Sequence, residues 1–304
     1  MFSTLSNKLI VAISSRALFN LDEEHEIYEK EGIEAYTDYQ RTKEQEPLAP
    51  GPAFGLVQKF LKLNEGRENK DALVEVLLIS RNSADTGLRV FHSIRYYGLD
   101  LTRAAFAGGK SPYGYAKAFG ADLFLSLNQD DVEAALQNNL AAATIWSINN
   151  ETVNDPNALK IAFDGDSVLF SDESERIFQE EGLAAFHAHE DKHAKLPMSP
   201  GPFKGFLSAL EKLQKKTNLS IPVRTALVTA RSAPAHERVI HTLRSWDIRI
   251  DESLFLGGLP KVEFLSAFGA DIFFDDHVKQ CDTASSKITS AHVPFGVRNP
   301  SKKL

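Results

Sequence analysis

The chain alternates short apolar runs, rich in β-branched residues, with longer amphipathic stretches. Runs of the first kind predict buried strands and occur at Leu9–Ile13, Val74–Ile79, Leu159–Phe163 and Arg224–Val228. Apolar residues at helical spacing predict helices at Gly55–Leu63, Leu88–Tyr97, Gly205–Leu213 and Val239–Trp246. Strands that alternate with helices imply an α/β fold with a largely parallel sheet covered on both faces.

The two halves of the chain also resemble each other. Early in each half, residues 150 places apart are similar, and Pro50-Gly51-Pro52 thus matches Pro200-Gly201-Pro202. After the loss of one residue the offset becomes 149, which pairs Phe119–Asp122 with Phe268–Asp271. A register held this long indicates an internal repeat. We therefore expect two copies of one domain, residues 1–150 and 151–304, joined through the polar stretch Ser147–Asn157.

Candidate chemistry gathers in the second copy, where polar groups close or follow the apolar runs. In chain order they are Asp164-Gly165-Asp166, Thr229, Lys261 and Asp275-Asp276. A parallel α/β sheet delivers functional side chains to the carboxyl edge of its strands. Two acidic pairs with a hydroxyl and a lysine between them therefore predict a Mg²⁺ site that handles a phosphoryl group.

The first copy holds other residues at the corresponding positions. These are Ser14, Arg16, Ile79, Pro112 and Ser126-Leu127. The candidate groups are thus present as a set in one copy and absent as a set in the other. This pattern favours a functional ensemble in the second copy, and it predicts that the first is a structural, lid-forming or regulatory partner.

The order of these motifs and their residues resemble those of a known superfamily. The four motifs of the haloacid dehalogenase-like phosphatases are similar to Asp164-x-Asp166-x-Val168, Thr229, Lys261 and Asp275-Asp276. The longer segments Phe163–Glu173 and Leu227–Ser232 resemble the cytosolic 5'-nucleotidase type 1 family in particular. The resemblance implies two tandem Rossmann-like domains of the haloacid dehalogenase type, the first degenerate, with a small helical cap.

The resemblance also implies a role for each motif residue. Asp164 would attack phosphorus, while Asp166 would protonate the leaving oxygen and later activate water. Thr229 and Lys261 would bind the phosphoryl oxygens, beside Gly165 and Ala230. The ligands of Mg²⁺ would be the Asp164 side chain, the Asp166 backbone carbonyl, Asp275 and Asp276.

Substrate choice is less well defined by the sequence. By family likeness the substrate is a nucleoside 5'-monophosphate, with AMP as the first candidate, and Arg231, Phe170 and Phe186 are candidate substrate contacts. The expected cap, within Asp172–Lys195, is small. We therefore expect the first copy, or a second subunit of a homo-oligomer, to complete the roof over the site.

Other functions have to be weighed against this one. The pattern His189-Glu190-x-x-His193 satisfies the zinc-protease motif, but we interpret it as a solvated helix face because its inner residues are charged and no third ligand is evident. A phosphatase of another small phosphoester is a nearer alternative. A non-catalytic Mg²⁺-dependent nucleotide sensor belongs to a different class.

Composition indicates which partners and which cellular compartment this chemistry would have. The 304 residues are 43% hydrophobic, enough for one or two ordinary cores. A formal charge of -7 argues against a nucleic-acid polymer as partner. The single cysteine, Cys281, excludes an internal disulfide and fits a reducing compartment. Since no run resembles a signal peptide or membrane span, we expect a cytoplasmic protein without a membrane partner.

Overall fold

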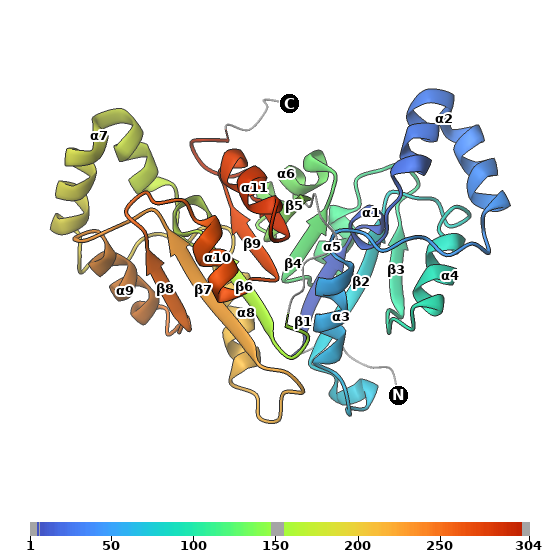
Figure 1. The fold of residues 1–304 in the computed structure, drawn as a ribbon, viewed down its shortest axis with the longest axis horizontal. Helices are drawn as coiled ribbons and strands as arrows, with labels where there is room; N and C mark the ends of the chain where they lie inside the picture. Colours follow the sequence, from blue (N-terminus) through green and yellow to red (C-terminus); the bar gives the residue numbers. More distant parts are fainter. Residues whose placement is uncertain (1–4, 6, 147–154, 300–304) are drawn as a thin grey trace.

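The computed structural model describes residues 5, 7–146 and 155–299, and these build one ten-stranded sheet (Figure 1). The strand order is β3-β2-β1-β4-β5-β10-β9-β6-β7-β8. The strands are β1 Leu9–Ile13, β2 Val74–Ser80, β3 Arg103–Phe106, β4 Leu123–Ser126, β5 Ala142–Trp146, β6 Leu159–Phe163, β7 Val223–Thr229, β8 Glu252–Phe255, β9 Ile272–Asp275 and β10 Ser290–His292. Most of the expected linker, residues 147–154, lies outside the described residues.

The predicted α/β fold with a largely parallel sheet is confirmed. Neighbouring strands run parallel except β5 and β10, which pair antiparallel with Trp146 opposite Ser290. Outward from this pair, the strand orders β5-β4-β1-β2-β3 and β10-β9-β6-β7-β8 follow the same plan. The two tandem domains implied by the resemblance would each have a sheet of its own, but the structure joins both halves in one sheet at these two strands.

Helices lie on both faces of the sheet, with α10 in front of it and α8 behind it in Figure 1. They are α1 Ser15–Leu18, α2 Asp22–Thr42, α3 Phe54–Lys62, α4 Leu88–Tyr96, α5 Tyr113–Ala118, α6 Gln129–Gln137, α7 Glu173–Lys192, α8 Lys204–Gln214, α9 His236–Ser245, α10 Val262–Phe268 and α11 Val278–Ser285, with short turns η1 Asn69–Asp71 and η2 Gly165–Leu169. All eight strands and helices predicted from periodicity are present to within a few residues.

Aromatic side chains form the core beneath the second half of the sheet. Phe163 of β6 stacks on Phe274 of β9 with ring centroids 5.5 Å apart. Phe203 and Phe206 pack against both rings, and all four side chains are buried. Burial of one such side chain contributes about 1.5–3 kcal/mol. This packing fixes the ends of β6 and β9, where the acidic motifs follow.

Two long helices stand at opposite ends of the molecule, α2 and α7 (Figure 1). Each is broken by a glycine with positive φ, Gly32 at φ 87° and Gly182 at φ 84°. A residue with a side chain rarely adopts this backbone conformation. The break folds α7 into a helical hairpin at the position where the small cap was expected. No helix in the described ranges is both long enough and apolar enough to cross a membrane.

Candidate active site

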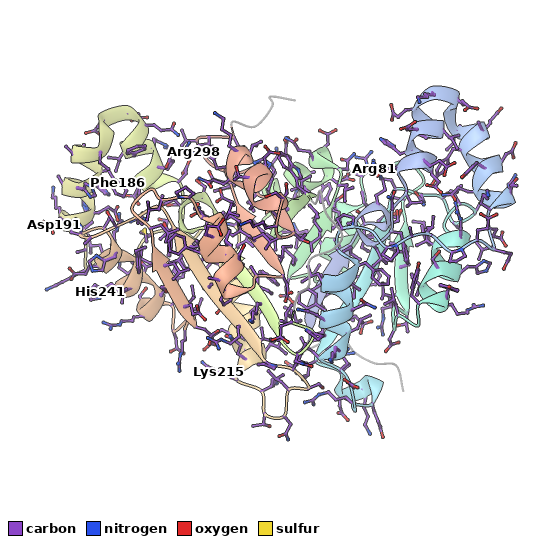
Figure 2. The ribbon with its side chains drawn as sticks, viewed as in Figure 1. Arg81, Phe186, Asp191, Lys215, His241 and Arg298 are labelled. Atoms are coloured by element: carbon purple, nitrogen blue, oxygen red, sulfur yellow. The ribbon has the colours of Figure 1, made fainter. Side chains whose placement is uncertain are left out.

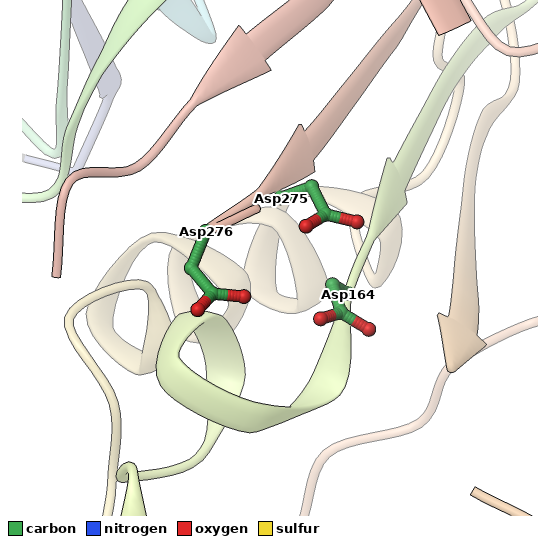
Figure 3. A group of neighbouring side chains, drawn as sticks. All are labelled: Asp164, Asp275 and Asp276. Carbon is green, nitrogen blue, oxygen red and sulfur yellow. The ribbon is translucent and has the colours of Figure 1, made fainter. Parts of the chain in front are cut away.

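Three acidic side chains converge at the carboxyl ends of β6 and β9 (Figure 3). The two strands are neighbours, with Phe163 opposite Phe274, so Asp164 lies beside Asp275 and Asp276. One ligand oxygen from each carboxylate lies within 4.8 Å of the others, and all three residues are buried. Within residues 7–146 and 155–299, this is the one group of three or more His, Cys, Asp or Glu side chains placed to hold a metal ion.

Lys261 lies between two of these carboxylates. Its Nζ is 2.8 Å from Asp164 Oδ1 and 2.7 Å from Asp275 Oδ2. Burial lowers the pKa of Lys261, but the charges of Asp164 and Asp275 outweigh burial and the net pKa is raised. The side chain therefore stays cationic at neutral pH. One lysine cannot neutralise three ionised carboxylates, so ionisation of all three is unfavourable without a further cation.

The pKa values of two of these carboxyl groups are raised, first by burial and then by the neighbouring charges. Burial raises the pKa of Asp164 to about 7, with Lys261 opposing the shift and Asp275 adding to it. Burial and then the charges of Asp164 and Asp275 raise the pKa of Asp276 to about 9. Asp276 Oδ2 is also buried without a hydrogen-bond partner, which is rare in folded proteins. A hard divalent cation with oxygen ligands fits all three observations.

The residues predicted to bind phosphate lie at the same edge of the sheet as the acidic cluster. Thr229 ends β7, next to β6, and its Oγ1 accepts a hydrogen bond of 3.2 Å from the Arg231 backbone N–H. A Cβ at Gly165 would lie 3.4 Å from that hydroxyl oxygen, so the two residues are neighbours. Ala230 follows and is exposed. The structure therefore brings Asp164, Gly165, Thr229, Lys261 and the Asp275-Asp276 pair together.

Asp166 is held by an arginine. Arg231 donates from Nε to Asp166 Oδ2 at 2.8 Å and from Nη2 to Oδ1 at 2.7 Å. This bidentate geometry is the strong form of an Arg–carboxylate pair. Arg231, expected as a substrate contact, is buried and occupied by this pairing.

The two aromatic candidates for substrate contact also have protein partners. Phe170 is completely buried and packs against Trp246 with ring centroids 5.6 Å apart. Phe186 comes from the cap helix α7 (Figure 2), and the Arg231 guanidinium lies 5.4 Å from its ring centre. Both rings are thus buried against protein partners, and a contact of either with substrate stays a prediction.

Comparison with known proteins agrees with this geometry. A family model described as 5'-nucleotidase matches residues 1–300. The chain belongs to the 5'-nucleotidase family. Cytosolic 5'-nucleotidase 1B of Homo sapiens is 41% identical over 282 residues, which cover 90% of this chain and 46% of that protein. The chain therefore spans about half the length of this relative. The family resemblance inferred from the motifs is confirmed.

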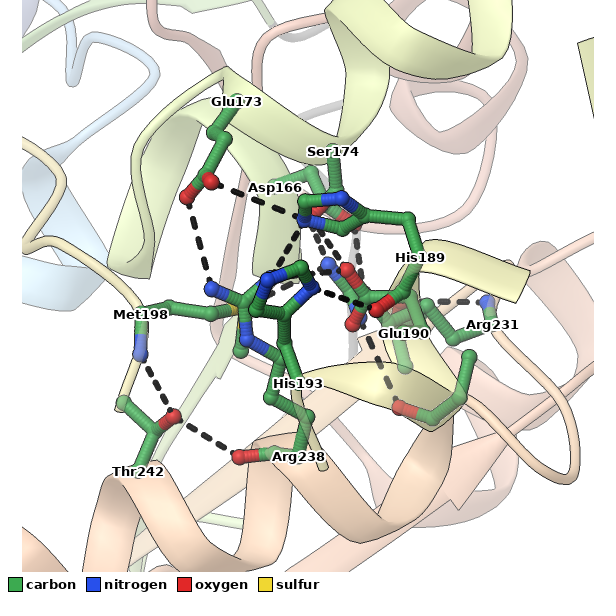
Figure 4. Close-up of polar contacts among 12 residues, drawn as sticks. Asp166, Glu173, Ser174, His189, Glu190, His193, Met198, Arg231, Arg238 and Thr242 are labelled. Atoms are coloured by element: carbon green, nitrogen blue, oxygen red, sulfur yellow. Dashed lines mark hydrogen bonds and ion pairs between the residues drawn. The ribbon is translucent and has the colours of Figure 1, made fainter. Parts of the chain in front are cut away.

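This member of the 5'-nucleotidase family also contains a buried ionic network that was not predicted from the sequence (Figure 4). Glu190 of α7 is 0% exposed and pairs with Arg231 and Arg238. The prediction of a solvated helix face is therefore wrong for Glu190, since a charge can be buried where it is fully paired. One signal was present: Arg238 recurs in the first half as Arg89, and each is followed by a buried valine on its helix.

The histidines of the same pattern form no metal site with Glu190. The rings of His189 and His193 lie 4.2 Å apart, and His193 Nδ1 is 2.8 Å from the His189 backbone carbonyl. We expect His193→Ala to change kcat by no more than about threefold, because the side chain is half-buried and packs against His189. Phosphate release at saturating substrate measures this. Loss of all activity together with loss of bound zinc would contradict it.

The strand register corrects one pairing between the two halves. Ile13 lies opposite Leu78 and Phe163 opposite Leu227, so the counterpart of Thr229 is Ser80 rather than Ile79. The Asn82 backbone N–H donates to Ser80 Oγ at 3.1 Å, as that of Arg231 does to Thr229. The prediction that the whole polar set is absent from the first half is therefore wrong at this hydroxyl.

Proposed function

We propose that this chain is a Mg²⁺-dependent 5'-nucleotidase that hydrolyses a nucleoside 5'-monophosphate, AMP first among the candidates, to a nucleoside and phosphate. A 5'-nucleotidase is a phosphoric monoester hydrolase. The observation that carries the proposal is the buried Asp164 carboxylate, which is bonded to Lys261 and lies within reach of two further aspartates at one sheet edge. A nucleophilic carboxylate beside others needs such cationic compensation.

The reaction proceeds in two steps. Asp164 attacks phosphorus, an O–P bond to its carboxylate forms, and the bond from phosphorus to the 5'-oxygen breaks as Asp166 donates a proton to that oxygen. Asp166 then takes a proton from water, whose oxygen displaces Asp164 and releases phosphate. Lys261 and the Thr229 hydroxyl hold the phosphoryl oxygens, with Gly165 and Ala230 lining the same turn.

The metal ligands follow from the acidic cluster. The side chains of Asp164, Asp275 and Asp276 and the Asp166 backbone carbonyl would hold Mg²⁺. When bound, the ion offsets the negative charge that the carboxylates and the phosphoryl group bring together. The unpartnered Asp276 Oδ2 supports this assignment because it leaves one buried acceptor free for a ligand.

The catalytic domain in this proposal is the second of two copies, residues 151–304, and residues 1–150 form a degenerate copy. Hydrogen bonds repeated at matching positions support this. The Leu48 N–H donates to Ser93 Oγ at 2.9 Å, as that of Met198 does to Thr242 Oγ1 at 3.0 Å. The first copy then stabilises the shared sheet, and a roof formed by it or by a second subunit stays a prediction.

A panel of phosphoesters tests the assignment. With Mg²⁺ present, purified protein should release phosphate from nucleoside 5'-monophosphates at least about tenfold faster, in kcat/KM, than from 3'-monophosphates or sugar phosphates, since leaving-group position sets alignment with Asp164. If the protein prefers another phosphoester, that compound replaces nucleoside 5'-monophosphates as the assigned substrate. Tight nucleotide binding without turnover would instead indicate a sensor.

The relative's name places it in the cytosol, and we propose the same compartment here.

A further inference from the structure

Glu190, on the cap helix, collects three hydrogen-bond donors in the interior. Its Oε1 accepts from Ser174 Oγ at 2.8 Å and from Arg238 Nη1 at 2.9 Å, and its Oε2 pairs with Arg231 Nη1. The carboxylate is 0% exposed. Removing a charge from such a buried network costs more than a surface ion pair would suggest, so the position is built for a carboxylate.

Arg231 connects this carboxylate to Asp166. One edge of the guanidinium, Nε and Nη2, is bonded to both oxygens of Asp166, while Nη1 is bonded to Glu190. The guanidinium is planar, with donors in a rigid fork, so fixing one edge fixes the other. Phe186 lies against its face, and Met198 Sδ is 3.3 Å from Nη2. The cap helix is thereby linked to the Asp166 side chain.

The first half of the chain shows what remains when Asp166 is absent. Gln40 takes the place of Glu190, and its Oε1 accepts from Arg89 Nη1 at 3.1 Å, as Glu190 accepts from Arg238. The register puts Asn82 at the position of Arg231. Arg89 Nη1 also donates to Glu24 Oε1 at 2.6 Å, and Glu24 stands at the position of Ser174, so the arginine common to both halves has a buried carboxylate partner in each. What occurs only in the half that has Asp166 is the second arginine, Arg231, with the carboxylate at position 190, where it pairs with both arginines.

We propose that Glu190 is a positioning residue for Asp166, acting through Arg231; this rests on the proposed function, in which Asp166 protonates the leaving oxygen. Arg231 occupies both Asp166 oxygens, so one of them must be freed before it can deliver a proton. Glu190 retains Arg231 when that happens. Without the charge of Glu190, Arg231 pairs with Asp166 alone and holds it away from the leaving group.

The test compares two leaving groups. Glu190→Gln should lower kcat for AMP by about 10- to 100-fold, because proton donation to a poor alkoxide leaving group contributes about that much or more. For p-nitrophenyl phosphate, whose leaving group departs without a proton, kcat should change by less than about threefold. Asp166→Asn serves as the reference for this discrimination. Glu190→Asp, which retains the charge, should restore part of the AMP rate.

The matched control is Gln40→Leu in the first half, which should lower thermal stability and leave the ratio of the two rates unchanged. Should Glu190→Gln fail to fold, Arg231→Lys keeps the charge, loses the fork and should show the same discrimination. Equal loss for both substrates, or no loss, in the folded variants overturns the proposal. If Asp166→Asn itself shows no discrimination, or Asp164→Asn keeps its activity, the proposed function fails instead.

Discussion

Replacing Asp164 by asparagine is expected to lower kcat for AMP by about 10⁴-fold or more, as removal of a covalent nucleophile does in other hydrolases. The amide has nearly the same volume, so packing against the neighbouring residues is kept. It cannot form an acyl phosphate with the substrate, and it withdraws one charge from the contact with Lys261 Nζ. The loss is therefore chemical, and folding should be preserved.

Two measurements decide this prediction. Steady-state phosphate release gives kcat, and acid quenching after mixing with ³²P-labelled AMP should leave label on wild-type protein and none on the variant. Ser14→Ala is the matched control, since Ser14 is the counterpart of Asp164 and its Oγ accepts from the Ala17 N–H at 3.2 Å. That change should cost about 1 kcal/mol as the loss of a helix cap and leave kcat unaltered. Activity of Asp164→Asn within tenfold of wild type would refute the nucleophile.

The sequence could predict the location of these motifs because strand ends are a local property. Leu9–Ile13 and Leu159–Phe163 were bounded correctly by their apolar runs. Side chains that follow parallel strands share one edge of a sheet, so Asp164, Thr229 and Asp275 could be expected to meet. The structure brings them together at the ends of β6, β7 and β9.

The continuity of the sheet could not be predicted in this way. It depends on the antiparallel pairing of β5 with β10, and β10 is only the three residues Ser290–His292. A strand so short and polar carries no alternating or apolar signature. Pairing between distant strands is set by tertiary packing, which periodicity within one segment does not record.

The buried ionic network could not be predicted from the sequence for a different reason. Glu190 and Arg231 belong to residue types that are almost always exposed unless paired, and pairing requires partners that are distant along the chain. Asp166 and Arg231 are 65 residues apart, and Arg231 and Glu190 are 41 apart. Only the comparison of the two halves carries a trace of this arrangement, because Arg238 recurs there as Arg89, with Gln40 in place of Glu190.

Removing divalent metal is expected to stop turnover, with a loss of about 10³-fold or more, and to make stability depend on pH. In the folded chain the pKa values of Asp164 and Asp276 lie at about 7 and about 9, above the ordinary value of 3.8. A raised folded pKa means that the native state binds protons more tightly than the unfolded state. The resulting stabilisation is complete below about pH 4 and is lost as the pH rises through about 7 and then about 9.

In EDTA, these two groups should therefore stabilise the folded state less at about pH 8.5 than at about pH 5, which lowers Tm at the higher pH. Mg²⁺ should raise Tm more at the higher pH, because protons no longer compete with the ion for the carboxylates. Asp276→Asn should reduce the pH dependence of the EDTA-treated protein, because the amide carries no charge at either pH. Equal Mg²⁺-induced shifts at both pH values would contradict a metal site at this cluster. The three aspartates are buried with ligand atoms within 4.8 Å of one another, so the burial and repulsion that destabilise the metal-free fold at high pH are what a bound cation is expected to relieve.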